Sequence, residues 1–153
     1  IGIRDEILLK PGKLTDEEFE VMRKHPAIGA GIIGNQKSEL LDCARVVALT
    51  HHEKWNGKGY PRQRAGDDIP IEGRIVAIAD VFDALTSERP YKSAWTVEKT
   101  IAVMQQDTGT HFDPNLMPLF IERLPEMLAV KAHYSENLPA AKASEDSAAL
   151  VTT

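Results

Sequence analysis

The chain has 153 residues, of which 42% are hydrophobic and 27% charged, a composition typical of one globular domain. Its net charge of −5 argues against binding to long nucleic acids, because phosphate backbones require clustered positive charge. No apolar run approaches the roughly 20 residues of a membrane span, and no signal peptide is visible. The single cysteine, Cys43, excludes an internal disulfide, so we expect a cytoplasmic protein in which Cys43 is a small buried hydrophobe.

The first third of the chain predicts three helices. Thr15-Asp16-Glu17-Glu18 is a capping box that begins the first of them. This helix is interrupted near Pro26, and a second helix runs from Pro26 to about Ile33. A third covers Leu40 to Thr50, which leaves His51 and His52 at its C-terminal end.

The next part of the chain predicts a long loop followed by a helix. Residues 53–69 contain several glycines and prolines and predict a long ordered loop. Ile71 to Leu85 is the most apolar helix, and we expect it to be buried on most sides.

The last part predicts two further helices and a tail. Thr96 caps a helix that runs to about Gln106, and Asp113-Pro114 opens another that ends near Ala129. Residues 135–153 have almost no large apolar side chain and predict a flexible tail, so residues 1–134 form the domain. The predicted fold class is all-α.

Four residues have the chemistry of metal ligands: His25, the pair His51 and His52, and Asp80. Asp80 and Asp83 are three residues apart, so they share one face of their helix. A carboxylate buried among the apolar neighbours of Asp80 would be costly unless a cation or strong hydrogen-bond donors met it. The residues alone leave two interpretations open, a catalytic metal site and a structural hydrogen-bond network.

Three other residues have simpler expected roles. Glu53 either orients a ligating histidine or is exposed. His111 is expected to pack in a loop or to cap a helix, and Arg23 to lie on a solvated face.

The segment from His51 to Pro61 joins a His-His-Glu sequence to a Gly-Tyr-Pro sequence. With His25-Pro26-Ala27-Ile28-Gly29 before it and Ile78 to Leu85 after it, the chain resembles the HD-GYP family. Ser87 to Lys92 and Gly109 to Pro114 also match that family, and the resemblance runs from Ile1 to about Leu124. It implies a helical bundle of the HD superfamily. The activity implied is that of bacterial signalling proteins, including response regulators, that hydrolyse cyclic di-GMP with two or three metal ions, often iron or manganese.

By position, the resemblance also implies two sets of functional residues. The implied metal ligands are His25, His51, His52 and Asp80, and His51, His52 and Asp80 are the implied catalytic residues. The implied substrate-binding residues are Tyr60, Arg89 and Lys92. An arginine can hold a phosphate through two hydrogen bonds, a lysine adds a point charge, and a tyrosine offers a ring or a hydroxyl.

The sequence also departs from the family. The His-Asp pair that names the family, a further His and often a Glu come before the segment that matches Ile1, and this sequence does not contain them. We therefore expect an N-terminally truncated domain with a partial or empty metal site and little activity by itself.

Two alternatives remain open beside a cyclic di-GMP phosphodiesterase. One is a non-catalytic module that docks a diguanylate cyclase domain through the Gly-Tyr-Pro loop. The other is a phosphohydrolase for another nucleotide. The expected partners are cyclic di-GMP and an upstream sensory or receiver domain, and no nucleic acid.

Overall fold

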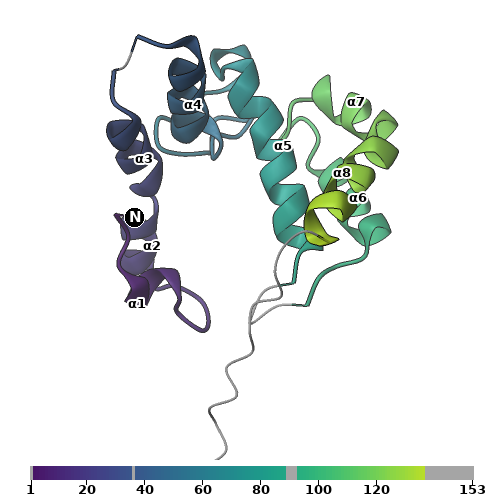
Figure 1. Ribbon diagram of the computed structural model, residues 1–153, viewed down its shortest axis with the longest axis horizontal. Helices are drawn as coiled ribbons and strands as arrows, with labels where there is room; N and C mark the ends of the chain where they lie inside the picture. Colours follow the sequence, from purple (N-terminus) through teal and green to yellow (C-terminus); the bar gives the residue numbers. More distant parts are fainter. Residues whose placement is uncertain (1, 36, 89–92, 137–153) are drawn as a thin grey trace, which may run out of the picture. The chain divides into compact units, whose positions relative to one another are not determined.

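The computed structural model describes residues 2–35, 37–88 and 93–136. The predicted all-α class is confirmed, since the described residues contain helices and isolated bridges but no strand. The helices are α1 (Asp5–Leu8), α2 (Asp16–Met22), α3 (His25–Ile33), α4 (Glu39–Thr50), η1 (Gly66–Asp68), α5 (Ile71–Thr86), α6 (Val97–Gln106), α7 (Leu116–Glu122) and α8 (Leu124–Glu136) (Figure 1). The chain divides into two compact units, Ile1–Ile121 and Glu122–Thr153.

The capping box at the start of α2 is confirmed. The Thr15 hydroxyl accepts a hydrogen bond from the Glu18 amide at 3.3 Å, and Glu18 accepts one from the Thr15 amide at 2.8 Å. The helix ends at Met22, and α3 begins at His25 with Pro26 in its first turn. A proline is tolerated there because the amide that it lacks would have no partner within the helix. The sequence therefore places His25 at a helix start.

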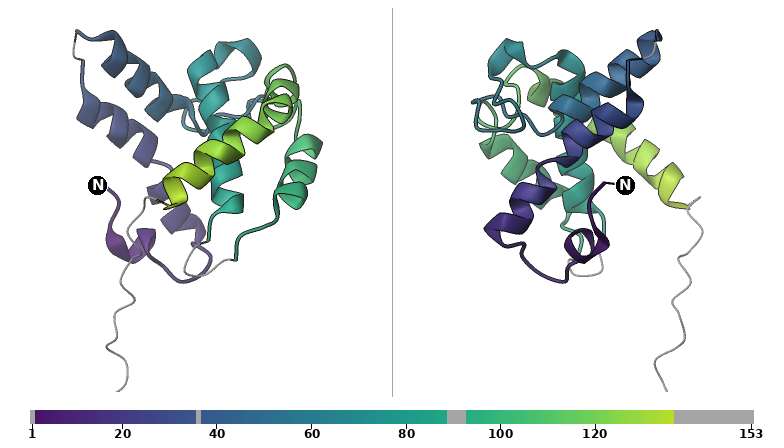
Figure 2. Two further views of the ribbon diagram at one scale, coloured as in Figure 1. Left: turned by 45° about the vertical axis from the view of Figure 1, so that its right-hand side comes forward. Right: turned by 90° about the vertical axis from the view of Figure 1, so that its left-hand side faces the viewer.

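Helices α3, α4 and α5 pack in succession within the first unit (Figures 1 and 2). The α4–α5 contact is close at Gly73, where a Cβ atom would lie 2.1 Å from the Thr50 hydroxyl oxygen. Glycine allows this approach because it has no side chain. The C-terminal end of α4, which precedes His51 and His52, is thus fixed against α5.

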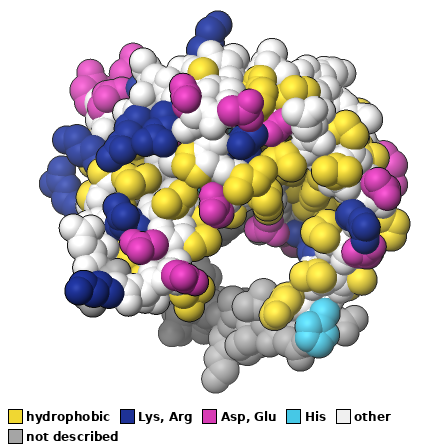
Figure 3. Space-filling model, turned by 90° about the horizontal axis from the view of Figure 1, so that it is seen from above, with side chains coloured by type: hydrophobic (Ala, Val, Ile, Leu, Met, Phe, Trp, Pro, Cys, Tyr) yellow, Lys and Arg dark blue, Asp and Glu magenta, His cyan; other side chains and the backbone are white. Residues whose placement is uncertain are grey.

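The predicted burial of α5 on most sides was wrong. Its buried residues are Gly73, Ala77, Ile78 and Phe82, which lie on one face at helical spacing. Ile75 keeps 51% of its surface exposed, and Ala79, Asp80 and Asp83 are exposed on the other side of the helix. Figure 3 likewise shows hydrophobic side chains open to the surface among charged ones. Composition alone cannot show which sides of an apolar helix meet a neighbour.

Two smaller expectations also failed. Cys43 on α4 is exposed, so it is not a buried hydrophobe. The helix predicted from Asp113-Pro114 to about Ala129 begins instead at Leu116 and divides into α7 and α8 around Arg123. Pro125 follows this division, and its missing amide cannot donate to the carbonyl of Ile121, which interrupts the helix.

Helices α2 to α6 lie close to their predicted bounds, whereas the short helices α1 and η1 were not predicted. Thr96 caps α6 by accepting a hydrogen bond from the Lys99 amide at 3.2 Å. Among the described residues, no helix combines the length and the hydropathy needed to cross a membrane.

Candidate metal centre

Three histidines from two helix ends converge in the first unit. His25 begins α3, and His51 and His52 follow the last residue of α4. Their candidate ligand atoms all lie within 4.8 Å of one another. Nε2 of His25 lies 3.3 Å from Nε2 of His51 and 3.1 Å from Nε2 of His52. Packing of α3 on α4 therefore joins residues that are 26 and 27 positions apart in the sequence.

Backbone carbonyls determine which nitrogen of two rings carries the proton. Nδ1 of His25 lies 2.8 Å from the Met22 carbonyl oxygen, and Nδ1 of His51 lies 3.0 Å from that of Val47. A carbonyl can only accept, so in both rings Nδ1–H donates and, in the neutral ring, Nε2 keeps its lone pair. The two Nε2 atoms that face each other are then both acceptors. Such an arrangement is unfavourable unless a proton or a cation lies between them.

The donor set fits a divalent metal ion. Ligand nitrogens about 2.1 Å from one ion, at angles of roughly 90–110°, are about 3.0–3.4 Å apart. The two Nε2–Nε2 distances, 3.1 and 3.3 Å, fall in this range. Burial, with the neighbouring charges of His51 and His25, lowers the pKa of His52 from 6.5 to about 3. His52 is therefore a neutral imidazole at pH 7, which is the form that binds metals.

Tyr60 lies directly against this histidine cluster. Its ring stacks on His52, with centroids 4.8 Å apart and planes at 30°, and its amide donates to the His52 carbonyl at 3.1 Å. The Arg23 guanidinium carbon lies 5.2 Å from the centroid of the Tyr60 ring. Burial raises the pKa of Tyr60, Arg23 opposes this effect and Asp80 adds to it. The Gly-Tyr-Pro sequence thus contributes its aromatic ring to the same site.

Asp80 behaves differently from the expectation. It is exposed on α5, so the argument from the cost of burying its carboxylate was wrong. It is not in the group of close ligand atoms formed by the three histidines. Burial raises the pKa of Tyr60 and lowers that of His111, and the charge of Asp80 makes a smaller upward contribution to both. Asp80 therefore lies within electrostatic range of the histidine cluster, but it is not one of the converging ligands. Arg89 and Lys92 lie outside the described residues.

Sequence reasoning missed part of the surroundings of two residues, Arg23 and His111. Arg23 was expected on a solvated face, yet its guanidinium lies over the rings of Phe19 and Tyr60. His111 stacks on the buried Phe112, as a loop-packing residue would, but it also lies close enough to His52 to lower the pKa of that ring. Phe19 and Phe112 are near neighbours of these two residues in the sequence, but no local pattern indicates the contacts with Tyr60 and His52, which come from distant segments.

Glu53 has neither of the two roles that the sequence left open. Its side chain is 2% exposed, and its two carboxylate oxygens accept hydrogen bonds from the backbone amides of Arg62 at 2.7 Å and Arg64 at 3.1 Å. It therefore binds the loop backbone and no histidine. Its position directly after His52 was the only signal available in the sequence.

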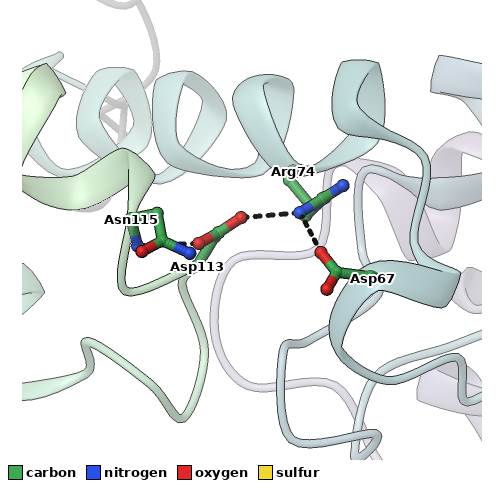
Figure 4. A network of polar contacts seen from close by, with 4 residues as sticks. All are labelled: Asp67, Arg74, Asp113 and Asn115. Atoms are coloured by element: carbon green, nitrogen blue, oxygen red, sulfur yellow. Dashed lines mark hydrogen bonds and ion pairs between the residues drawn. The ribbon is translucent and has the colours of Figure 1, made fainter.

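A second polar network holds the C-terminal end of the loop between α4 and α5 (Figure 4). Nη1 of Arg74 on α5 donates to Asp67 in η1 and to Asp113 before α7, each at 2.8 Å. Asp113 also accepts from the Asn115 amide at 2.8 Å. The network joins three segments around one arginine, and so it holds the loop to α5.

Comparison with known proteins identifies relatives of this chain. Residues 2–116 match the model of a family described as HD domain. A cyclic di-GMP phosphodiesterase of Vibrio cholerae is 47% identical over 141 residues, covering 89% of this chain and 29% of that protein. A 3′3′-cGAMP-specific phosphodiesterase 2 of the same organism is 48% identical over 132 residues, covering 86% of this chain and 25% of that protein.

A solved structure shares the fold. The crystal structure of a cyclic GMP-AMP-specific phosphodiesterase of V. cholerae superposes with a TM-score of 0.60 at 24% identity, covering 84% of this chain and 31% of the other. This chain spans less than a third of the length of these three relatives.

Proposed function

This chain belongs to the HD domain family, within the HD-GYP group that its motifs resemble, and on that premise we propose that it acts as a metal-dependent phosphodiesterase of cyclic di-GMP. The observation that carries the proposal is the convergence of the three histidine Nε2 atoms beside Tyr60. Relatives that are named cyclic di-GMP phosphodiesterases support the choice of reaction.

The proposed metal ligands are His25, His51 and His52, with Asp80 as a fourth. Iron or manganese is the proposed metal. Such ions, when bound, supply Lewis acidity toward phosphoryl oxygens. The carbonyls of Met22 and Val47 support this role because they hold two of the rings with Nε2 toward the cluster. In this proposal His51, His52 and Asp80 form the catalytic side of the site.

The proposed substrate side begins at Tyr60, whose ring lies next to His52. We assign the phosphate contacts to Arg89 and Lys92 on the strength of the sequence motif alone. A cyclic dinucleotide carries two phosphodiester groups, so one arginine and one lysine beside the metal centre would match its charge.

The name of one relative supports 3′3′-cGAMP as a second candidate substrate. One relative at 48% identity is named for 3′3′-cGAMP, which differs from cyclic di-GMP in one base. The phosphodiester chemistry is shared, so the site geometry is compatible with either molecule. Their relative rates decide between them.

The test uses the full-length gene product, purified after growth with iron and separately with manganese. Metal content is measured by elemental analysis, and hydrolysis of cyclic di-GMP and 3′3′-cGAMP is followed by chromatography. We expect at least one metal ion per chain and faster turnover of cyclic di-GMP. Faster turnover of 3′3′-cGAMP would instead assign the second substrate. A protein that binds no metal and hydrolyses neither compound, yet binds a diguanylate cyclase domain, would overturn the proposal in favour of a docking module.

A further inference from the structure

The loop between α4 and α5 is organised around a buried carboxylate. The side chain of Glu53 is buried, and 2% of the residue's surface is exposed. A buried carboxylate is costly unless strong donors meet it. Both of its oxygens have such donors, the amides of Arg62 and Arg64, at 2.7 and 3.1 Å. The side chain therefore spans the loop from its first residue to its turn.

The turn that Glu53 binds is strained. Gln63 has φ of 54°, in the left-handed region that residues other than glycine seldom adopt. The two amides held by Glu53 belong to the residues on either side of Gln63. Hydrogen bonds to a charged acceptor are among the stronger ones in proteins. They offset the cost of the left-handed residue and hold the turn in one conformation.

The packing of the loop around Glu53 also determines the position of Tyr60. Gly59 lies against the backbone of Glu53, where a Cβ atom would be 2.5 Å from the Glu53 Cα. The next residue, Tyr60, donates its amide to the His52 carbonyl and stacks its ring on the His52 imidazole. The chain thus leaves His52, folds around the Glu53 carboxylate and returns its aromatic ring to His52.

We propose that Glu53 is a positioning residue that holds Tyr60 on His52 and so shapes the substrate side of the metal centre. Glu53 itself touches neither a candidate ligand nor the substrate in this account. Its link to substrate binding rests on the proposed function, whereas its effect on the loop does not.

The first arm of the test measures the loop without reference to activity. Glu53→Gln keeps the size of the side chain but turns one oxygen into an amide group, which cannot accept from a backbone N–H. In the full-length protein we expect hydrogen exchange of at least one of the Arg62 and Arg64 amides to quicken by about tenfold or more, the effect of losing a hydrogen bond to a charged group. Glu98→Gln on the exposed side of α6 is the matched control and leaves this exchange unchanged.

The second arm measures substrate binding. Glu53→Gln should raise KM for cyclic di-GMP by about tenfold, the same loss expressed as affinity. It should leave metal content and most of kcat in place, because the histidines are untouched. In a Tyr60→Ala background the same substitution should have no further effect on KM, since both changes act through one ring.

The outcomes separate the inference from the proposed function. Unchanged exchange of both amides in Glu53→Gln overturns the inference, whatever the activity. A KM effect that adds fully to that of Tyr60→Ala also overturns it, because Glu53 would then act by another route. If Glu53→Gln does not fold, Glu53→Asp, which keeps the charge but shortens the reach, must show the faster exchange in its place. A parent protein without any hydrolysis defeats the proposed function, while the exchange arm still decides on Glu53.

Discussion

The ring of Tyr60 stacks on that of His52 at a centroid distance of 4.8 Å, and the Tyr60 amide bonds to the His52 carbonyl. One residue therefore takes both its backbone and its side-chain position from a candidate metal ligand eight positions earlier. These two contacts fix the position of the loop relative to the histidine cluster. The Gly-Tyr-Pro motif is thus part of the site's structure as well as of its predicted substrate contacts.

This contact predicts different results for two substitutions at Tyr60. Tyr60→Phe keeps the ring on His52, so substrate affinity should stay within about threefold of the parent, since the aromatic contact is retained. Tyr60→Ala removes the ring and should lower affinity by about tenfold or more, or at least about 1.4 kcal/mol. Both are measured by titrating cyclic di-GMP into the metal-loaded full-length protein. Equal losses in both variants would mean that the hydroxyl makes the decisive contact.

The histidine geometry predicts loss of metal from single substitutions. His52→Ala removes one of three converging nitrogens, so metal affinity should fall by more than about 100-fold, because even residues behind the ligands contribute about 10- to 100-fold. Asp80→Ala should also reduce metal content if this exposed carboxylate turns toward a bound ion. Elemental analysis after dialysis measures both, with Glu98→Gln as the control. Full metal content in Asp80→Ala would remove Asp80 from the ligand set.

The network around Arg74 predicts a large effect on stability. Arg74 is 15% exposed and its partner Asp113 only 2%, so Arg74→Met leaves a buried carboxylate without its cation. Breaking such a pair should lower the free energy of unfolding by about 3–5 kcal/mol. The control, Arg123→Met, breaks a pair in which both side chains are 62% exposed and should change stability by less than about 0.5 kcal/mol. Urea denaturation measures both, and equal effects would contradict this account of the network.

Two glycines predict opposite effects of the same substitution. Gly31→Ala on α3 meets no atom within 4 Å and should stabilise the protein by about 0.5–1 kcal/mol through helix propensity. Gly73→Ala on α5 would bring a Cβ to 2.1 Å from the Thr50 hydroxyl oxygen, so it should destabilise by about 1–3 kcal/mol. It should also weaken metal binding, because Thr50 directly precedes His51. Chemical denaturation compares the two variants, and stabilisation by Gly73→Ala would show that α4 and α5 can separate at little cost.

Local signals in the sequence were sufficient for the fold class and most helices. Thr15 with Glu18, and Thr96 with the Lys99 amide, make caps within four residues of chain, so their contacts follow from spacing alone. The same reasoning placed His25 near a helix start and His51 with His52 at a helix end. The motif resemblance then singled out these histidines and Tyr60 together.

Tertiary structure alone decided how these residues meet. The contact between His25 and His51 depends on how α3 packs on α4, and the exposure of Asp80 depends on which side of α5 has a neighbour. Glu53 could not be assigned from its own position, because its partners are the amides of Arg62 and Arg64, which any residue type could provide. Short-range hydrogen bonds and steric limits act within one turn of chain and are therefore readable in the sequence. Packing and burial depend on segments that only folding brings together.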